Sequence, residues 1–167
     1  ERLGHASVPD LGLVQNNLLT NISQKVAGMD WIVNWEIIQK NTREIIQDFD
    51  VRCRKFSQKA RTLSGGNLQK FVVGRELIKN PKLLVINQPT WGVDMGAAKQ
   101  IRQEMRELAE KGCIIIAISQ DLDELFELCD KLAVLNNGTL GHAKDIEEWD
   151  MPALGLEMVK IDHEIGT

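Results

Sequence analysis

The residue types best suited to chemistry lie in one stretch, Leu63-Ser64-Gly65-Gly66-Asn67-Leu68-Gln69-Lys70. An apolar helical run follows, so the stretch offers backbone N–H groups at a helix N-terminus, where the helix dipole is positive. Glycines let a backbone approach a phosphate closely, and Ser64 can cap the helix or donate to a phosphate oxygen. A basic stretch, residues 52–61, precedes it and would add attraction beside a phosphate, although such stretches are usually solvated connectors. An ordinary turn and cap has the same sequence signature, so the neighbouring elements must decide between the two interpretations.

The overall composition sets limits on the class of protein. The chain has 167 residues, 43% hydrophobic and 26% charged, which is typical of one soluble globular domain or part of a larger one. The formal net charge is −4, so no basic excess indicates nucleic acid. No apolar run approaches the length of a membrane span, and the N-terminus does not resemble a signal peptide. The three cysteines lack metal-ligand spacing, and we expect reduced, buried thiols in a cytosolic protein.

The first half of the chain predicts helices that pack together. One helix is expected to begin near Leu13, and Trp31 and Trp35 stand four residues apart, which places them on one helical face. The same face continues through Ile38, Ile45 and Phe49. Such a stripe is typical of helix packing, although a partner-facing role for part of it stays open.

The second half alternates between helix and strand patterns. A predicted helix over residues 65–79 contains Gly74, whose cost of about 1 kcal/mol relative to alanine indicates close packing. Uninterrupted apolar runs predict strands buried on both faces. These runs are Leu83–Ile86, Cys113–Ile118 and Leu132–Leu135. The strand, helix, strand order predicts parallel pairing with helical crossovers.

Polar residues mark the ends of these elements. Asp94 and Asp121 stand where each can cap the helix that follows. Asn136-Asn137-Gly138 predicts a tight turn leading to a short strand around Thr139-Leu140. The tail is expected to be helical near residues 146–149. The strand that ends at Ile86 leads into Asn87 and Gln88, at the edge of a sheet where α/β proteins place their sites.

The order of these motifs resembles the nucleotide-binding domain of ABC transporters, over nearly the whole chain. Leu63–Gln69 is similar to the signature motif, Leu83–Gln88 to Walker B, Trp91–Asp94 to the D-loop and Ser119–Asp121 to the switch-histidine region. The resemblance implies an α/β fold: a P-loop NTPase-like parallel sheet that lacks the P-loop strand, with an α-helical subdomain. We therefore expect a loop and helical subdomain at 1–62, the signature helix and Walker B half of the core at 63–143, and a C-terminal tail at 144–167.

A narrower resemblance covers Phe49–Arg52, Ala60–Asn67 and Gln88–Asp94. These segments are similar to the second nucleotide-binding domain of bacterial simple-sugar and nucleoside importers, whose ATPase subunit carries two such domains in one polypeptide. Gln88 and the run from Asp121 to Leu125 favour the nucleoside type, which has a basic-membrane-protein-like lipoprotein receptor.

The chain departs from a working ATPase of this family in three ways. It has no Gly-x-x-x-x-Gly-Lys-Ser/Thr loop to hold phosphates, so we expect a domain fragment that begins just after the family's P-loop and Q-loop. Asn87 stands at the position of the Mg²⁺-organising aspartate, and Gln88 at that of the catalytic glutamate. Gln120 stands at the switch-histidine position. Amides cannot act as a general base, so this site is expected to be slow or inactive, unless the amides are merely tolerated there.

The signature motif is the part of this machinery that remains. In the family two domains meet head to tail, and each signature completes the ATP site on the other domain's P-loop. The nucleotide-binding residues implied by the resemblance are Ser64, Gly65, Gly66, Asn67, Gln69 and Asp94, the last at the dimer contact. ATP and Mg²⁺ are the cofactors of the intact transporter, and this chain alone is expected to bind neither and not to hydrolyse ATP.

The resemblance also implies partners and a location. The partners are a second nucleotide-binding domain and transmembrane permease subunits, with no nucleic acid, at the cytoplasmic face of the bacterial inner membrane. Residues 13–60 would transmit motion to the permease. The missing P-loop strand would leave exposed sheet edges, so the isolated chain is expected to be an oligomer or a domain-swapped dimer, which a concentration-independent monomer in light scattering would contradict.

Three alternatives to the trans-acting role stay open. They are a self-sufficient ATPase, a non-transport ABC protein acting on ribosomes or DNA, and a structural pseudo-domain without nucleotide contact.

Overall fold

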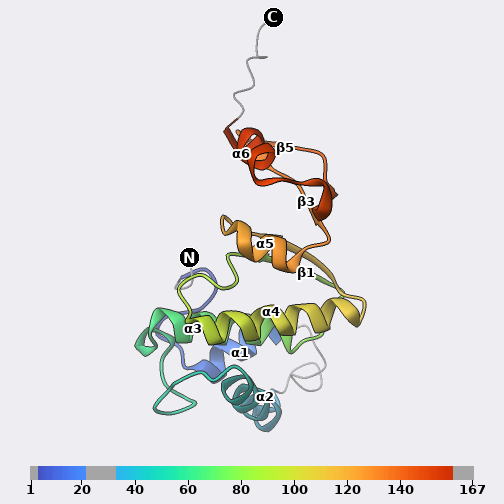
Figure 1. Ribbon diagram of the computed structural model, residues 1–167. Helices are drawn as coiled ribbons and strands as arrows, with labels where there is room; N and C mark the ends of the chain where they lie inside the picture. The colour runs from blue at the N-terminus through green and yellow to red at the C-terminus, as the bar shows by residue number, and fades with distance from the viewer. Residues whose placement is uncertain (1–3, 22–32, 160–167) are drawn as a thin grey trace, which may run out of the picture. The chain divides into compact units, whose positions relative to one another are not determined.

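The structure is a computed structural model that describes residues 4–21 and 33–159 (Figure 1). Its contacts divide the chain into two compact units, residues 1–118 and 119–167, and each is described by itself. Within the described ranges, no helix is long and apolar enough to span a membrane. The expected boundaries at 62/63 and 143/144 stay a prediction.

The first unit begins with a cluster of helices. Helices α1 (Leu13–Asn21), α2 (Trp35–Asp48) and α3 (Gly65–Leu77) pack together, and α4 (Met95–Glu110) lies against α3 (Figure 1). The helix expected near Leu13 is confirmed. On α2 the apolar stripe is buried at Ile38 and Ile45, whereas Trp35 is 46% exposed. Trp31, the expected companion of Trp35, lies outside the described residues.

The close packing expected at Gly74 is confirmed. A Cβ atom added at Gly74 would lie 2.5 Å from the ring of Phe49, which is 5% exposed. The glycine therefore lets α3 approach the residue that follows α2, and the cost in helix propensity is offset by burial of an aromatic ring.

A two-stranded parallel sheet completes the first unit. Strands β1 (Leu83–Asn87) and β2 (Ile114–Ile118) pair in register from Leu83 and Ile114 to Asn87 and Ile118, with α4 as the connection. Both strands and their parallel pairing are confirmed. After β2 the chain passes to the second unit.

The expectation that these strands are buried on both faces is wrong. On one face Leu84 is 7% exposed, whereas Val85 and Ile114 on the other are 60% and 66% exposed. The face that is exposed in the described part of the chain carries Leu83, Val85, Ile114, Ile116 and Ile118. The described residues pack against one face only, so continuous apolar composition did not mean burial on both sides.

The second unit contains α5 (Leu122–Leu128) and two antiparallel pairs. Strand β3 (Lys131–Leu132) pairs with β6 (Lys144–Asp145), and β4 (Leu135–Asn136) pairs with β5 (Thr139–Leu140). The hairpin expected at Asn137 is confirmed. A single third strand over Leu132–Leu135 is wrong, because two antiparallel ladders divide that run.

The tail closes the small core of the second unit. The helical turn expected near residues 146–149 is a 3₁₀ helix over Ile146–Glu148, and α6 (Met151–Val159) follows. The indole of Trp149 is 8% exposed and donates to the carbonyl of Leu132 at 3.1 Å. Leu132, Trp149 and Leu154 form the centre of this core.

The three cysteines are free thiols, as expected, but their burial differs. Cys113 is buried, while Cys53 and Cys129 are half-buried. Desolvation raises the pKa of both half-buried thiols, and Asp130 and Glu124 add to the effect at Cys129. A raised thiol pKa lowers the thiolate fraction and hence the reactivity of these cysteines.

Candidate anion-binding site at the start of helix α3

Helix α3 begins with the cap expected at Ser64. The Ser64 backbone is extended, and its Oγ accepts from the backbone N–H of Asn67 at 3.4 Å and from the Asn67 side-chain amide at 2.8 Å. The other end of that amide accepts from the N–H of Arg52 at 2.7 Å. The N–H groups of Gly65 and Gly66 have no acceptor among the described residues. Such groups at a helix N-terminus can donate to an anion.

An open pocket of about 230 Å³ lies over this helix end. It is smaller than pockets that enclose a drug-sized ligand, about 300–1,000 Å³. The pocket is lined by Arg52, Ser64, Gly66, Asn67, Lys70, Gly92 and Asp94. The pocket thus has room for a phosphate-sized group but does not surround a whole nucleotide.

One wall of the pocket comes from a close backbone approach. A Cβ at Gly66 would lie 2.9 Å from the carbonyl oxygen of Gly92, which itself has a φ of 70°. Glycine at position 92 fits because a positive φ is strained for other residues. The turn over residues 91–94 is therefore held directly against the start of α3.

Lys70 is a member of this site that the sequence did not single out. Its side chain is 7% exposed, and its Nζ lies 3.3 Å from Asp94 Oδ2 and 3.6 Å from Asp50 Oδ2. It also donates to the backbone carbonyl of Asp50 at 3.4 Å. Lys70 thus connects α3 to the residue that caps α4 and to the segment after α2.

Asp94 caps α4, as expected, with Oδ1 accepting from the N–H of Ala97 at 2.9 Å. That hydrogen bond, followed by the interaction with Lys70, lowers the pKa of the Asp94 carboxyl. A lowered carboxyl pKa contributes stability that is present above the unfolded-state pKa and is lost as the pH falls through the folded-state pKa.

Replacing Lys70 by methionine is therefore expected to raise the pKa of Asp94 partway toward its ordinary value. The N–H of Ala97 keeps part of the shift, because it still donates to Oδ1. An NMR titration of the Asp94 carboxyl carbon measures this change. Lys99→Met, on the exposed face of α4, is the matched control. An unchanged Asp94 pKa in Lys70→Met would show that Lys70 does not contribute to the lowered pKa of Asp94.

The other residues singled out from the sequence near β1 occupy two kinds of position. Asn87 is exposed at the end of β1, and Gln88 follows with a φ of 51° while its N–H donates to Ile118 at 2.8 Å. Gln69 is 6% exposed, and its amide donates to the carbonyls of Gln88 at 3.1 Å and Pro89 at 2.8 Å. Gln69 therefore holds the end of β1 and faces away from solvent.

Gln120 belongs to the second unit and is exposed. Its neighbours form a compact cap: Ser119 Oγ donates to Glu124 at 2.8 Å, and Asp121 Oδ1 accepts from the N–H of Glu124 at 3.1 Å. The cap expected at Asp121 is confirmed.

The donor set fits a phosphate better than a metal ion. Backbone N–H groups, a hydroxyl and Arg52 are groups that bind phosphate oxygens. The described residues contain no group of three or more acidic, histidine or cysteine side chains that could hold a metal, and Asn87 supplies only an amide oxygen.

No family model matches the chain, but many curated proteins are similar to it, including import ATP-binding proteins from three organisms. A glucose import ATP-binding protein of Haloferax volcanii is 32% identical over 95% of the chain and 29% of its own length. A guanosine import ATP-binding protein of Bacillus subtilis is 33% identical over 95% of the chain and 31% of its own length. A ribose import ATP-binding protein of Rubrobacter xylanophilus is 32% identical over 89% of the chain and 30% of its own length. The chain thus spans less than a third of each of these relatives.

Solved structures show the same architecture. A nucleotide-free ATP-binding cassette from an ABC transporter matches with a TM-score of 0.61 at 27% identity, over 82% of this chain and 56% of the cassette. A dimeric ATP-binding cassette in a post-hydrolysis state, bound to ADP and Pi, matches with a TM-score of 0.71 over 88% of this chain and 62% of the cassette. Because its sequence identity is 21%, this match shows a shared fold and no more.

Proposed function

The chain is homologous to ATP-binding subunits of ABC importers and has the fold of an ABC ATPase cassette. From this we infer that its signature motif, Leu63–Gln69, completes an ATP site that it shares with another domain. The phosphate-binding loop of that site lies on the partner domain. Sugars or nucleosides are the transported class, in line with the glucose, guanosine and ribose named for the relatives.

The observation that carries this proposal is the start of α3. The Gly65 and Gly66 N–H groups have no acceptor in the described part of the chain. Gly66 lines a pocket that is sized for a phosphate rather than for a nucleotide. A site of this kind needs a second surface to hold the rest of ATP. We propose that another nucleotide-binding domain supplies that surface through its P-loop.

The chemistry assigned to these residues is electrostatic. The Ser64 hydroxyl and the N–H groups of Gly65 and Gly66 donate to oxygens of the γ-phosphate, and the positive end of α3 favours the charge. Asn67 holds the Ser64 hydroxyl in place through its 2.8 Å hydrogen bond. ATP supplies the phosphate that draws the two domains together, and hydrolysis at the partner's loop releases them.

The residues at the end of β1 give this chain little hydrolytic power of its own. Gln88 cannot accept a proton from water, and general base catalysis is worth about 10²–10⁴-fold in rate. Asn87 is a weaker ligand for Mg²⁺ than a carboxylate. Gln120 can donate a hydrogen bond but cannot carry the charge of a protonated histidine.

The proposed setting is the cytoplasmic face of a bacterial membrane, with permease subunits and a second nucleotide-binding domain as partners. Residues 13–60, which include α1 and α2, transmit domain closure to the permease. We further propose that the isolated chain associates with itself, because the exposed apolar face of the β1–β2 sheet is of the kind that marks interaction surfaces.

Replacing Ser64 by alanine in the complete subunit is expected to lower ATP hydrolysis about 10–100-fold, because a hydrogen bond to a charged group is lost. Ser64→Thr keeps the hydroxyl and should retain most of the activity. Asp150→Ala is the control for loss of a cap alone, since Asp150 Oδ1 accepts from the N–H of Ala153 at 2.6 Å in the second unit.

Two outcomes would overturn the proposal. If Ser64→Ala keeps full ATPase activity and transport, the chain is better explained as a structural pseudo-domain without nucleotide contact. ATP turnover by the purified chain would mean a self-sufficient enzyme.

A further inference from the structure

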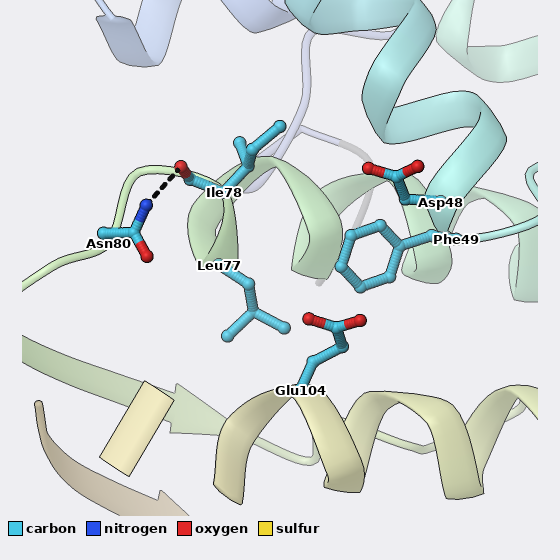
Figure 2. A pocket seen from close by; sticks show the side chains of 6 residues that line it. All are labelled: Asp48, Phe49, Leu77, Ile78, Asn80 and Glu104. Atoms are coloured by element: carbon cyan, nitrogen blue, oxygen red, sulfur yellow. Dashed lines mark hydrogen bonds between the residues drawn. The ribbon is translucent and has the colours of Figure 1, made fainter. Parts of the chain in front are cut away.

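A second pocket, separate from the anion-binding site, lies where the C-terminal ends of α2 and α3 meet the middle of α4 (Figure 2). Its volume is about 210 Å³, enough for one side chain. We call it the acidic pocket, and all its lining residues belong to the first unit. They are Asp48, Phe49, Leu77, Ile78, Asn80 and Glu104.

One side of the acidic pocket is apolar and firmly held. Phe49 and Leu77 are each 5% exposed, so their side chains form part of the core that α2 and α3 share. The Phe49 ring is fixed by its packing against Gly74. Asn80 is turned aside, because its amide donates to the carbonyl of Ile78 at 3.3 Å (Figure 2).

Two carboxylates stand at the rim. In Figure 2 the Phe49 ring lies between the carboxylate of Asp48, from α2, and that of Glu104, from α4. Neither carboxylate has a hydrogen bond or an ion pair with another residue in the described part of the chain. Desolvation, followed by repulsion from Glu107 and Asp48, raises the pKa of Glu104, and Lys111 opposes this only in part.

We propose that the acidic pocket receives an arginine side chain of a partner protein. The guanidinium would lie at the rim over the Phe49 ring, facing Asp48 and Glu104, and the aliphatic stem would extend toward Leu77. Charge complementarity favours a cation, and the apolar side favours one with an apolar stem over a hydrated metal ion. The weakly hydrated, planar guanidinium suits carboxylates beside an aromatic ring better than the compact ammonium of lysine.

The proposal is independent of the signature role, because it uses no residue of the anion-binding site. It gives the first unit a second contact, through which a basic segment of a partner would join α2, α3 and α4. The partner is identified here only by this chemistry: an exposed arginine on a protein surface.

The test is an NMR titration of the ¹⁵N-labelled chain with Nα-acetyl-arginine methylamide. We expect saturable shifts confined to the amides of residues 48–49, 77–80 and 104. The matched citrulline compound has nearly the same shape without the charge and should bind at least about tenfold more weakly, the discrimination that a charge-assisted pair provides.

Variants of the rim test which groups bind. Glu104→Gln and Asp48→Asn should each weaken arginine binding at least about fivefold, which corresponds to part of the free energy of one charge-assisted hydrogen bond. Glu110→Gln, exposed near the end of α4, should not. Equal binding of the arginine and citrulline compounds, or unchanged binding in both rim variants, would overturn the proposal.

Stability provides a second measurement that needs no ligand. A carboxyl whose folded-state pKa is raised destabilises the fold above that pKa, and the penalty disappears as the pH falls toward the unfolded-state value. Glu104→Gln should therefore have a Tm at neutral pH at least as high as the parent chain. A lower Tm would mean that Glu104 already has a stabilising partner within the fold, and would also overturn the proposal.

Discussion

Replacing Asn16 by aspartate is expected to lower the free energy of unfolding by about 1–3 kcal/mol at neutral pH, the cost of leaving buried polar groups without partners. The loss stays in this range because the Arg75 guanidinium, which donates to the Asn16 carbonyl at 3.2 Å, offsets part of the buried charge. Asn16 lies in α1 and is 1% exposed. Its Oδ1 accepts from the N–H of Val8 at 2.7 Å, and its Nδ2 lies 3.1 Å from the carbonyls of Val8, Leu11 and Gly12. Aspartate would place a charged oxygen against these three carbonyls.

The pH dependence of this loss has a defined sign. Burial and the facing carbonyl oxygens disfavour the charged form, so the carboxyl introduced by Asn16→Asp has a folded-state pKa above its unfolded value of about 3.9. The penalty is full above the folded-state pKa and shrinks as the pH falls, because the neutral acid can donate to one carbonyl.

Urea unfolding of Asn16→Asp at neutral pH and near the unfolded-state pKa measures both statements. Asn137→Asp is the matched control, because Asn137 is exposed in the β4–β5 turn with a φ of 47°, a conformation that aspartate also tolerates. Equal stability of Asn16→Asp and the parent chain at neutral pH would mean that the loop over residues 8–12 rearranges freely around Asn16.

The elements that the sequence predicted well are those determined by local hydrogen bonds. Ser64, Asp94 and Asp121 each accept from a backbone N–H three residues ahead, so the cap and the start of the helix are encoded together. Strands β1 and β2 followed from short apolar runs between turn residues. The hairpin at Asn137 followed in the same way, since a tight turn is a property of the residues within it.

The predictions that failed depended on what lies across from an element. An uninterrupted apolar run shows that both faces of a strand carry apolar side chains, but it does not show which residues cover each face. In the described part of the chain, Val85 and Ile116 on one face are exposed. The run over Leu132–Leu135 was divided because Leu132 pairs with Lys144. That pairing joins distant segments and has no local signal.

The candidate site shows the same division. The cap and the two glycines could be predicted because they are adjacent in sequence. Lys70 could not, because its role depends on Asp50 and Asp94, which lie on either side of it in sequence. The only hint was a lysine on the first turns of a helix whose following residues are apolar.

Replacing Gly66 by valine in the complete subunit is expected to lower ATP hydrolysis by about 100-fold, the size of effect that follows loss of one preorganised donor. A Cβ at this position would lie 2.9 Å from the carbonyl oxygen of Gly92, so a branched side chain must displace the turn over residues 91–94 or tilt the start of α3. Either movement misaligns the Gly65 and Gly66 N–H groups and separates Asp94 from Lys70.

Steady-state ATPase assays of the complete subunit measure this loss, and Gly155→Val is its control. Gly155 lies in α6, and a Cβ there meets nothing within 4 Å, so valine adds the same bulk in a helix without a clash. Full activity in Gly66→Val would show that the approach of Gly66 to Gly92 is not needed to present the α3 N-terminus to a phosphate, and the proposed trans-acting role would lose its geometric basis.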